Sequence, residues 1–82
     1  MGDLKMMELS RPLDTLNKSK GKRIVVELKG GRQYVGSLNA FDIHINIVLD
    51  DAEERENNEL KRKVGTVFIR GDTITIIFPE SK

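Results

Sequence analysis

The fold is decided by residues 22–38, which read KRIVVELKGGRQYVGSL. Apolar side chains recur at every second position from 24 to 28, the period of a strand with one buried face. The glycine pair at 30–31 is typical of the tight turn of a β-hairpin. Gly36 interrupts the returning strand and predicts a sharp bend or bulge, as at the corner of a barrel.

The segments on either side of this hairpin complete one small domain. Upstream, Ser10, Pro12 and Gly21 mark the start and the end of a short helix. Downstream, three more β-prone segments follow, and the acid-rich residues 50–59 are expected to form a solvated loop. We therefore predict a leader at 1–10, a domain at 11–79 and a C-terminal tail at 80–82, with the helix at about 11–20 and strands at about 22–29, 32–42, 43–50, 60–70 and 73–78.

A sheet this small can bury one face only by bending onto itself. We therefore predict a mostly β protein, in which a short N-terminal helix precedes a strongly bent five-stranded antiparallel barrel of SH3-like or OB-like form. The chain has 82 residues and no cysteine, so disulfides and thiolate metal sites are excluded as sources of stability. Compact β packing or self-association must supply it.

The charge is distributed unevenly. The formal net charge is +1, but residues 50–59 contain six acids and one base, which leaves a net +6 on the remainder. The bases Lys18, Lys20, Lys22 and Arg23 form either a phosphate-facing patch or a solvated helix end. No apolar run approaches the ~20 residues of a membrane span, and the N-terminus lacks the apolar region of a signal peptide. We expect a soluble, cytoplasmic protein.

Catalysis has little support. One histidine and no cysteine leave carboxylates as the main metal ligands. A nucleophile, base and orienting acid would have to be Ser37, His44 and Asp42. However, Ser37 and His44 fall on different predicted strands, and nothing supplies an oxyanion hole. We expect no enzymatic activity, no cofactor and no metal.

Two short segments carry more information. Asp42, His44 and Asn46 occupy the polar side of an alternating segment and are expected to project from one sheet face. Residues 70–72, Arg-Gly-Asp, form a tight turn between two apolar strands. Imidazole and guanidinium groups stack on bases, whereas amides and carboxylates form hydrogen bonds with base edges. Together these groups predict a pocket for one unstacked base. The simpler alternative is that both segments are ordinary solvated turns.

At these two turns the sequence closely resembles the Sm and Sm-like (Lsm) family, above all its archaeal members. The resemblance covers residues 11–79. The first family motif corresponds to strands one to three and includes Phe41-Asp-Ile-His-Ile-Asn-Ile-Val-Leu49. The second corresponds to Gly65-Thr-Val-Phe-Ile-Arg-Gly-Asp-Thr-Ile74.

This resemblance implies the Sm fold and assembly into a ring, in which the fourth strand of one subunit pairs with the fifth strand of the next. A homoheptamer is expected. It also implies that uridine-rich single-stranded RNA binds around the inner rim of the pore, in a scaffold or chaperone role in RNA processing, with RNA-processing proteins as further partners. By position, the resemblance implies that His44 and Arg70 stack on the base and that Asn46 forms hydrogen bonds with the uracil edge. Asp72 would support the pocket, and Gly71 would form the turn. Asp42 would orient its own loop.

One alternative function remains open from the sequence. A structural or adaptor ring could act mainly through protein partners, with RNA incidental. Its working surfaces would then be the acidic loop at 50–59 and the face of the N-terminal helix.

Overall fold

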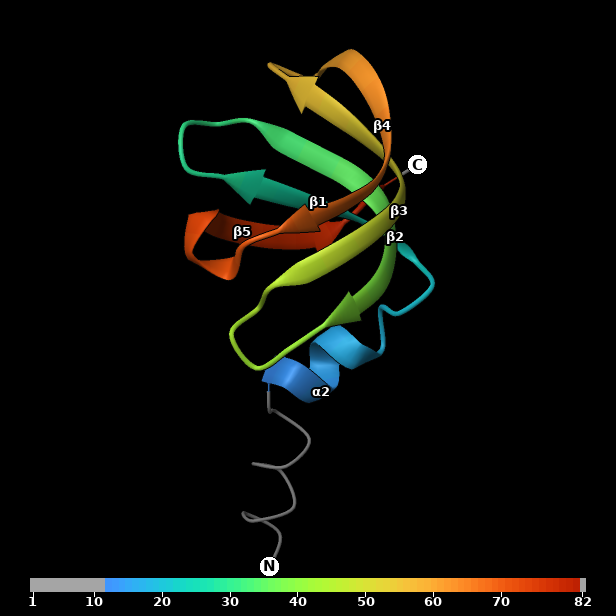
Figure 1. The fold of residues 1–82 in the computed structure, drawn as a ribbon, viewed down its shortest axis with the longest axis vertical. Coiled ribbons are helices and arrows are strands. Elements are labelled where there is room, and N and C mark those ends of the chain that lie inside the picture. Colours follow the sequence, from blue (N-terminus) through green and yellow to red (C-terminus); the bar gives the residue numbers. More distant parts are fainter. Residues whose placement is uncertain (1–11, 82) are drawn as a thin grey trace, which may run out of the picture.

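The computed structural model describes residues 12–81 (Figure 1). The predicted leader at 1–10 and the first residue of the predicted helix lie outside this range. No helix within residues 12–81 is long and apolar enough to cross a membrane. The elements are, in chain order, helix α2 (Pro12–Asn17), strands β1 (Arg23–Leu28), β2 (Gln33–Phe41), β3 (Ile47–Glu56) and β4 (Glu59–Ile69), the 3-10 turn η1 (Gly71–Thr73) and strand β5 (Ile74–Pro79).

The five strands form one sheet in the order β4-β3-β2-β1-β5, and every neighbouring pair is antiparallel. The sheet is strongly curved, with the short helix at one end (Figure 1). This architecture confirms the predicted fold class. Because β4 and β5 each have only one neighbour among the described residues, both are edge strands with backbone groups free to pair with another chain.

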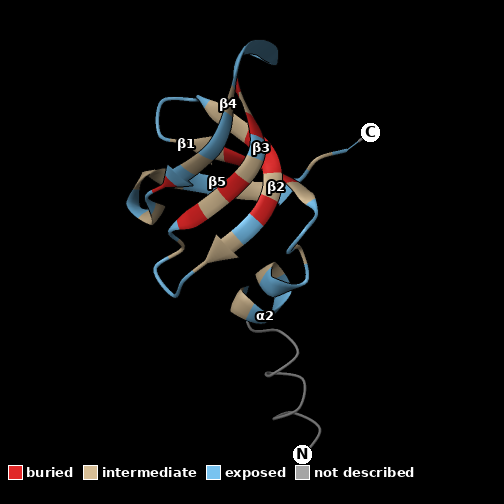
Figure 2. Cartoon of the chain, turned by 45° about the vertical axis from the view of Figure 1, so that its right-hand side comes forward, coloured by how far each residue is buried: buried red, intermediate tan, exposed pale blue. Residues whose placement is uncertain are grey.

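The core lies inside the curve of the sheet. Buried positions alternate along β3 on either side of its bulge, which shows that one face of this strand points inward (Figure 2). Leu16 of α2 packs against this cluster, which explains why so short a helix is stable. Burial of each large aliphatic side chain contributes roughly 1.5–3 kcal/mol. The cluster consists of Ile24, Val26, Leu38, Ile47, Leu49, Ala52 and Ile69.

The predicted bend at Gly36 is present. The register of β2 against β3 shifts between Val35 and Ser37, where β3 contains one extra residue, so β3 has a bulge opposite Gly36. A Cβ atom at Gly36 would lie 2.8 Å from the carbonyl oxygen of Asp50 and 3.1 Å from Cα of Ala52. The close approach of β3 therefore requires glycine here.

The predicted boundaries of the third strand were wrong. Residues 43–46 form a turn, and β3 runs from Ile47 to Glu56 instead of from 43 to 50. The acid-rich residues 50–59 are consequently not a loop, because β3 and β4 are joined by a two-residue turn. Asn57 and Asn58 have φ values of 54° and 65°, the left-handed conformation that a tight hairpin turn needs. Helix α2 is also shorter than predicted and ends at Asn17.

Ion pairs with arginines explain why an acidic segment forms a strand. The buried carboxylate of Glu54 lies 3.1 Å from Arg32 Nε and 2.8 Å from Arg62 Nε. The hydrogen bond that Arg62 donates to Glu54 raises the pKa of Arg62. These arginines belong to distant parts of the chain, so the pairing was not evident from the local sequence. The predicted separation into a basic body and a free acidic loop is therefore wrong, because Glu53 and Glu54 of this segment pair with arginines of the body.

A second group of ion pairs fixes the end of the described chain. Glu80 follows β5 and accepts a 2.8 Å hydrogen bond from Arg23 Nε of β1. Its other carboxylate oxygen lies 3.2 Å from Arg55 Nη2 of β3. The hydrogen bond from Arg23, supported by the charges of both arginines, lowers the pKa of Glu80. Three strands are thereby tied together at one point.

Candidate nucleic-acid interface

Two turns meet at one end of the sheet. The turn at 42–46 joins β2 to β3, and the turn at 70–73 joins β4 to β5; both lie on the same side of the molecule (Figure 1). They are connected directly, because the backbone N–H of Gly71 donates a 2.8 Å hydrogen bond to Oδ1 of Asn46. The sheet thus brings together two segments that are about 25 residues apart in sequence.

Asp42 organises the first turn. Its Oδ1 accepts hydrogen bonds from the backbone N–H groups of His44 (2.8 Å) and Asn46 (3.1 Å). Its Oδ2 accepts a third from the side-chain amide of Asn46, at 3.0 Å. The bond from the Asn46 side chain is the main cause that lowers the pKa of Asp42, so this carboxyl is ionised at neutral pH. The same network holds Ile45 at a φ of 60°, a left-handed conformation that β-branched residues rarely adopt.

The second turn is closed by its own polar groups. Thr73 Oγ1 donates a 2.7 Å hydrogen bond to the carbonyl oxygen of Arg70, and the backbone N–H of Thr73 bonds to the same oxygen at 3.1 Å. Nη2 of Arg70 lies 3.1 Å from Oδ2 of Asp72. Both ends of this ion pair are exposed, so its contribution to stability is small. Its main effect is to orient the guanidinium.

Gly71 is required by the close contact of the two turns. A Cβ atom at this position would overlap the carbonyl oxygen of His44 and would lie 2.8 Å from the carbonyl carbon of Ile45. Both are backbone atoms, which cannot move aside as a flexible side chain can. No residue larger than glycine therefore fits without separating the turns.

A concavity of about 420 Å³ lies where the turns meet. Five of the six predicted RNA-binding residues line it, and Asp42 is not among them because its carboxylate bonds within its own turn. The planar groups of His44 and Arg70 come from different turns, and both residues are exposed. The lining is made of His44, Asn46, Arg70, Gly71 and Asp72.

The side-chain amide of Asn46 has a fixed orientation. Its nitrogen faces a carboxylate, which only accepts, and its oxygen faces a backbone N–H, which only donates. Rotation of the amide by 180° would break both hydrogen bonds. One N–H and one oxygen lone pair of Asn46 remain free of these two bonds, so the turn presents a donor and an acceptor in a defined order.

The structure brings five of the six predicted residues together, but the predicted geometry of the first segment was wrong. Asp42, His44 and Asn46 were expected to share one face of a strand, whereas they belong to a turn organised by Asp42. Thr73, whose hydrogen bonds close the second turn, was not predicted as a site residue. Its position directly after Arg-Gly-Asp was the only sequence signal for this role.

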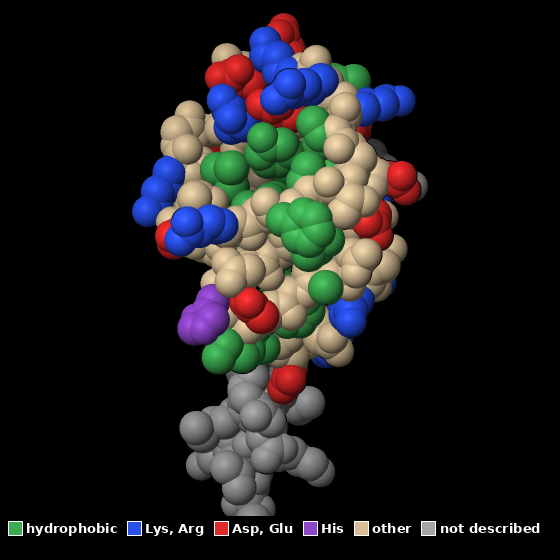
Figure 3. Space-filling view, viewed as in Figure 1, with side chains coloured by type: hydrophobic (Ala, Val, Ile, Leu, Met, Phe, Trp, Pro, Cys, Tyr) green, Lys and Arg blue, Asp and Glu red, His purple; other side chains and the backbone are tan. Residues whose placement is uncertain are grey.

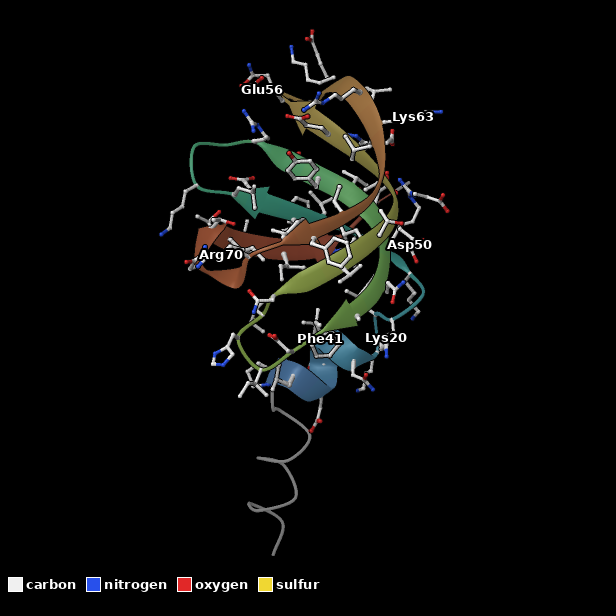
Figure 4. The ribbon with its side chains drawn as sticks, in the orientation of Figure 1. Lys20, Phe41, Asp50, Glu56, Lys63 and Arg70 are labelled. Atoms are coloured by element: carbon white, nitrogen blue, oxygen red, sulfur yellow. The ribbon has the colours of Figure 1, made fainter. Side chains whose placement is uncertain are left out.

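The alternative sites weighed from the sequence do not assemble. The basic patch is not brought to these turns, since Arg23 pairs with Glu53 and Glu80, and Lys20 lies on the opposite side from Arg70 (Figure 4). Ser37 lies within β2, in register with Arg23 of β1. Within residues 12–81, no group of three or more His, Cys, Asp or Glu side chains could hold a metal ion.

Exposed apolar side chains mark the two edge strands. On β4, Phe68 is 80% exposed, and on β5, Ile76 is 52% exposed. Figure 3 shows hydrophobic side chains gathered on the face that β4 crosses. A second apolar groove lies between α2 and β5, with Leu16, Ile76 and Phe78 in its lining. Exposed apolar side chains on edge strands are typical of a protein–protein interface.

Known proteins share this sequence and this fold. The LSM domain family matches residues 14–79. A protein of Archaeoglobus fulgidus named as an snRNP Sm-like protein is 55% identical over 69 residues, which cover 84% of this chain and 90% of the relative. The structure of the Pyrococcus abyssii Sm protein in complex with a uridine heptamer matches with a TM-score of 0.83 and 41% identity, over 87% of this chain and 100% of that chain. The SmAP1 heptamer of P. aerophilum matches with a TM-score of 0.80 and 35% identity, over 87% and 95% of the two chains.

Proposed function

The chain belongs to the LSM domain family of Sm-like proteins, and on this premise we propose that it is one subunit of a homoheptameric ring that binds uridine-rich single-stranded RNA at the inner rim of its pore. The ring acts as an RNA scaffold or chaperone in RNA processing. Two relatives support this proposal: one was solved with a uridine heptamer and the other as a heptamer. The cytoplasmic location and the RNA-processing protein partners stay predictions.

Ring formation is supported by the two edge strands. We infer that β4 of one subunit pairs with β5 of the next, which satisfies the free backbone groups of both edges. Phe68 on β4 would then be covered by the neighbour, against the groove between α2 and β5. Such a head-to-tail contact uses two different surfaces, so it repeats from subunit to subunit until the ring closes.

The fixed orientation of the Asn46 side-chain amide is the main support for binding of uridine-rich RNA. Uracil presents an N–H donor next to a carbonyl acceptor, whereas cytosine presents an acceptor next to an amino donor. An amide held in one orientation can pair with only one of these patterns. His44 and Arg70 would stack on the two faces of the base, and Asp72 would hold the guanidinium of Arg70 in place. Asp42 acts on the base only through Asn46.

Fluorescence anisotropy with labelled oligo-U and oligo-C at moderate salt tests this function. We expect oligo-U to bind more tightly, and we expect His44→Ala and Arg70→Ala each to weaken oligo-U binding. Native mass spectrometry should show an intact ring for both variants, because neither side chain lies on β4 or β5. Equal and negligible binding of both oligonucleotides by the wild-type ring would contradict the proposal.

The adaptor alternative loses one of its two surfaces. Residues 50–59 are a paired strand and a two-residue turn, and the carboxylates of Glu53 and Glu54 are occupied by arginines. A free acidic loop that could capture a basic protein partner is therefore not formed by these residues. RNA binding is the function that the arrangement of the two turns favours.

A further inference from the structure

The base pocket has little positive charge available for RNA phosphates. The charge of Arg70 is opposed by Asp72 at 3.1 Å, and the ionised carboxylate of Asp42 accepts a 3.0 Å hydrogen bond from the side chain of Asn46, which lines the pocket. Each nucleotide of a bound strand brings one phosphate charge with its base. A site that binds the base but does not neutralise the phosphate lacks the electrostatic attraction that supplies much of the affinity for RNA.

Half of the ten other Lys and Arg side chains within residues 12–81 also have carboxylate partners. Each of the five arginines within residues 12–81 has a carboxylate partner, as Arg32 has in Glu54 at 3.1 Å. Lys20 and Lys63 lie on the opposite side of the molecule from Arg70 (Figure 4). The lysines of the described chain that make no ion pair are Lys18, Lys20, Lys22, Lys29 and Lys63.

Among these lysines, Lys29 is connected to the turn at 70–73 by a backbone hydrogen bond. It begins the turn between β1 and β2, and its backbone N–H donates a 2.8 Å hydrogen bond to the carbonyl oxygen of Thr73, next to Asp72. Gly30 and Gly31, both with φ of 93°, complete the turn, which is closed by a 3.0 Å bond from Gly31 N–H to the oxygen of Leu28. This turn lies on the same side of the molecule as the two turns of the base pocket (Figure 1).

We propose that Lys29 binds the phosphate of the nucleotide whose base occupies the pocket between His44 and Arg70, an assignment that rests on the proposed function. Lys29 is exposed and has no carboxylate partner within residues 12–81, so its ammonium is free to meet a ligand. Arg32, at the other end of the same turn, is paired with the buried carboxylate of Glu54, so its guanidinium is less available than Lys29 to bind a phosphate. The turn thus supplies charge, and the two other turns supply the contacts with the base.

The salt dependence of oligo-U binding separates this role from base recognition. We expect Lys29→Ala to reduce the slope of log affinity against log salt by about 0.7 for each nucleotide contacted, the value for a single-strand phosphate. When salt rises from 50 to 200 mM, wild type should lose affinity for oligo-U. For each contacted nucleotide, Lys29→Ala should lose roughly 2.6-fold less affinity than wild type over the same range. Lys20→Ala, which removes an exposed lysine on the opposite side of the molecule from Arg70 and outside β4 and β5, should leave the slope unchanged.

Two further measurements sharpen the test. An oligo-U with an uncharged methylphosphonate backbone should bind wild type and Lys29→Ala equally, and the preference for U over C should be the same in both. His44→Ala should weaken binding without changing the slope. An unchanged slope in Lys29→Ala, in a ring that still binds oligo-U, would overturn the role of Lys29 alone. Absence of oligo-U binding by wild type would instead overturn the proposed function.

Discussion

Substitution of Gly71 by alanine tests whether the contact of the two turns creates the base pocket. The added Cβ atom would lie 2.8 Å from the carbonyl carbon of Ile45, and ordinary contact begins at about 3.4 Å. The turns must therefore separate by more than 0.6 Å, because the overlap with the carbonyl oxygen of His44 is closer still. The same movement would stretch the 2.8 Å bond between Gly71 N–H and Asn46 Oδ1 beyond about 3.4 Å, outside the usual range for N–H···O bonds.

The expected loss can be estimated from these two effects. Overpacking against rigid atoms costs about 1–3 kcal/mol, and the weakened hydrogen bond adds about 1 kcal/mol. If only 1.4 kcal/mol of this total is lost from RNA binding, affinity falls tenfold. We therefore expect Gly71→Ala to weaken oligo-U binding by about tenfold or more in fluorescence anisotropy. The ring should persist in native mass spectrometry, since Gly71 lies outside β4 and β5.

Gly21→Ala provides the matched control. Gly21 has a φ of +81°, so alanine there is strained, yet a Cβ atom would meet nothing within 4 Å. The strain costs about 1–2 kcal/mol of stability without displacing either turn of the site. We expect this variant to bind oligo-U within about twofold of wild type. The reasoning is refuted if Gly71→Ala also binds within twofold, or if the two variants weaken binding equally.

Three other changes have defined outcomes. Asp42→Asn places an NH2 group against the amide nitrogen of Asn46, so the preference for oligo-U over oligo-C, measured by anisotropy, should fall toward one. The hydrogen bond from Arg23 lowers the pKa of Glu80 in the folded protein. The ionised Glu80 side chain therefore stabilises the fold fully at pH values above its ordinary pKa of 4.5, and this stabilisation is lost as the pH falls through the lowered pKa of the folded state. Melting curves from pH 7 to pH 3 should therefore show Glu80→Gln less stable than wild type at neutral pH, with the difference shrinking in acid; a constant difference would contradict the ion pair's role. Phe68→Asp, at an 80% exposed position of β4, should yield monomers with an unchanged circular dichroism spectrum.

The sequence was sufficient for the fold because the deciding signals are local. Alternation over 24–28, the glycine pair and the bend at Gly36 each depend on residues within a few positions of one another. The extent of β3 was wrongly predicted because it depends on contacts across the chain. Glu54 is buried in a strand only because Arg32 and Arg62 reach it from two other segments, and an acidic run without such partners would remain in solvent.

The site was predictable in composition but not in geometry. Polar residues at every second position fit the exposed face of a strand, and they equally fit a turn in which an aspartate bonds to the following N–H groups. The sequence cannot distinguish these two conformations when the segment is this short. The steric requirement at Gly71 was also hidden, because the atoms that exclude a side chain belong to His44 and Ile45, about 25 residues earlier.

We expect the pocket of a single subunit to be too weak to hold RNA, which would make the edge strands part of the binding mechanism. Stacking contributes roughly 1–3 kcal/mol per base, whereas a millimolar complex already requires about 4 kcal/mol. Useful affinity therefore needs several pockets at fixed spacing, which a ring provides. Monomeric Phe68→Asp should then lose oligo-U binding although its own pocket is intact, since Phe68 does not line it. Tight oligo-U binding by that monomer would show that one subunit suffices, and it would separate RNA recognition from assembly.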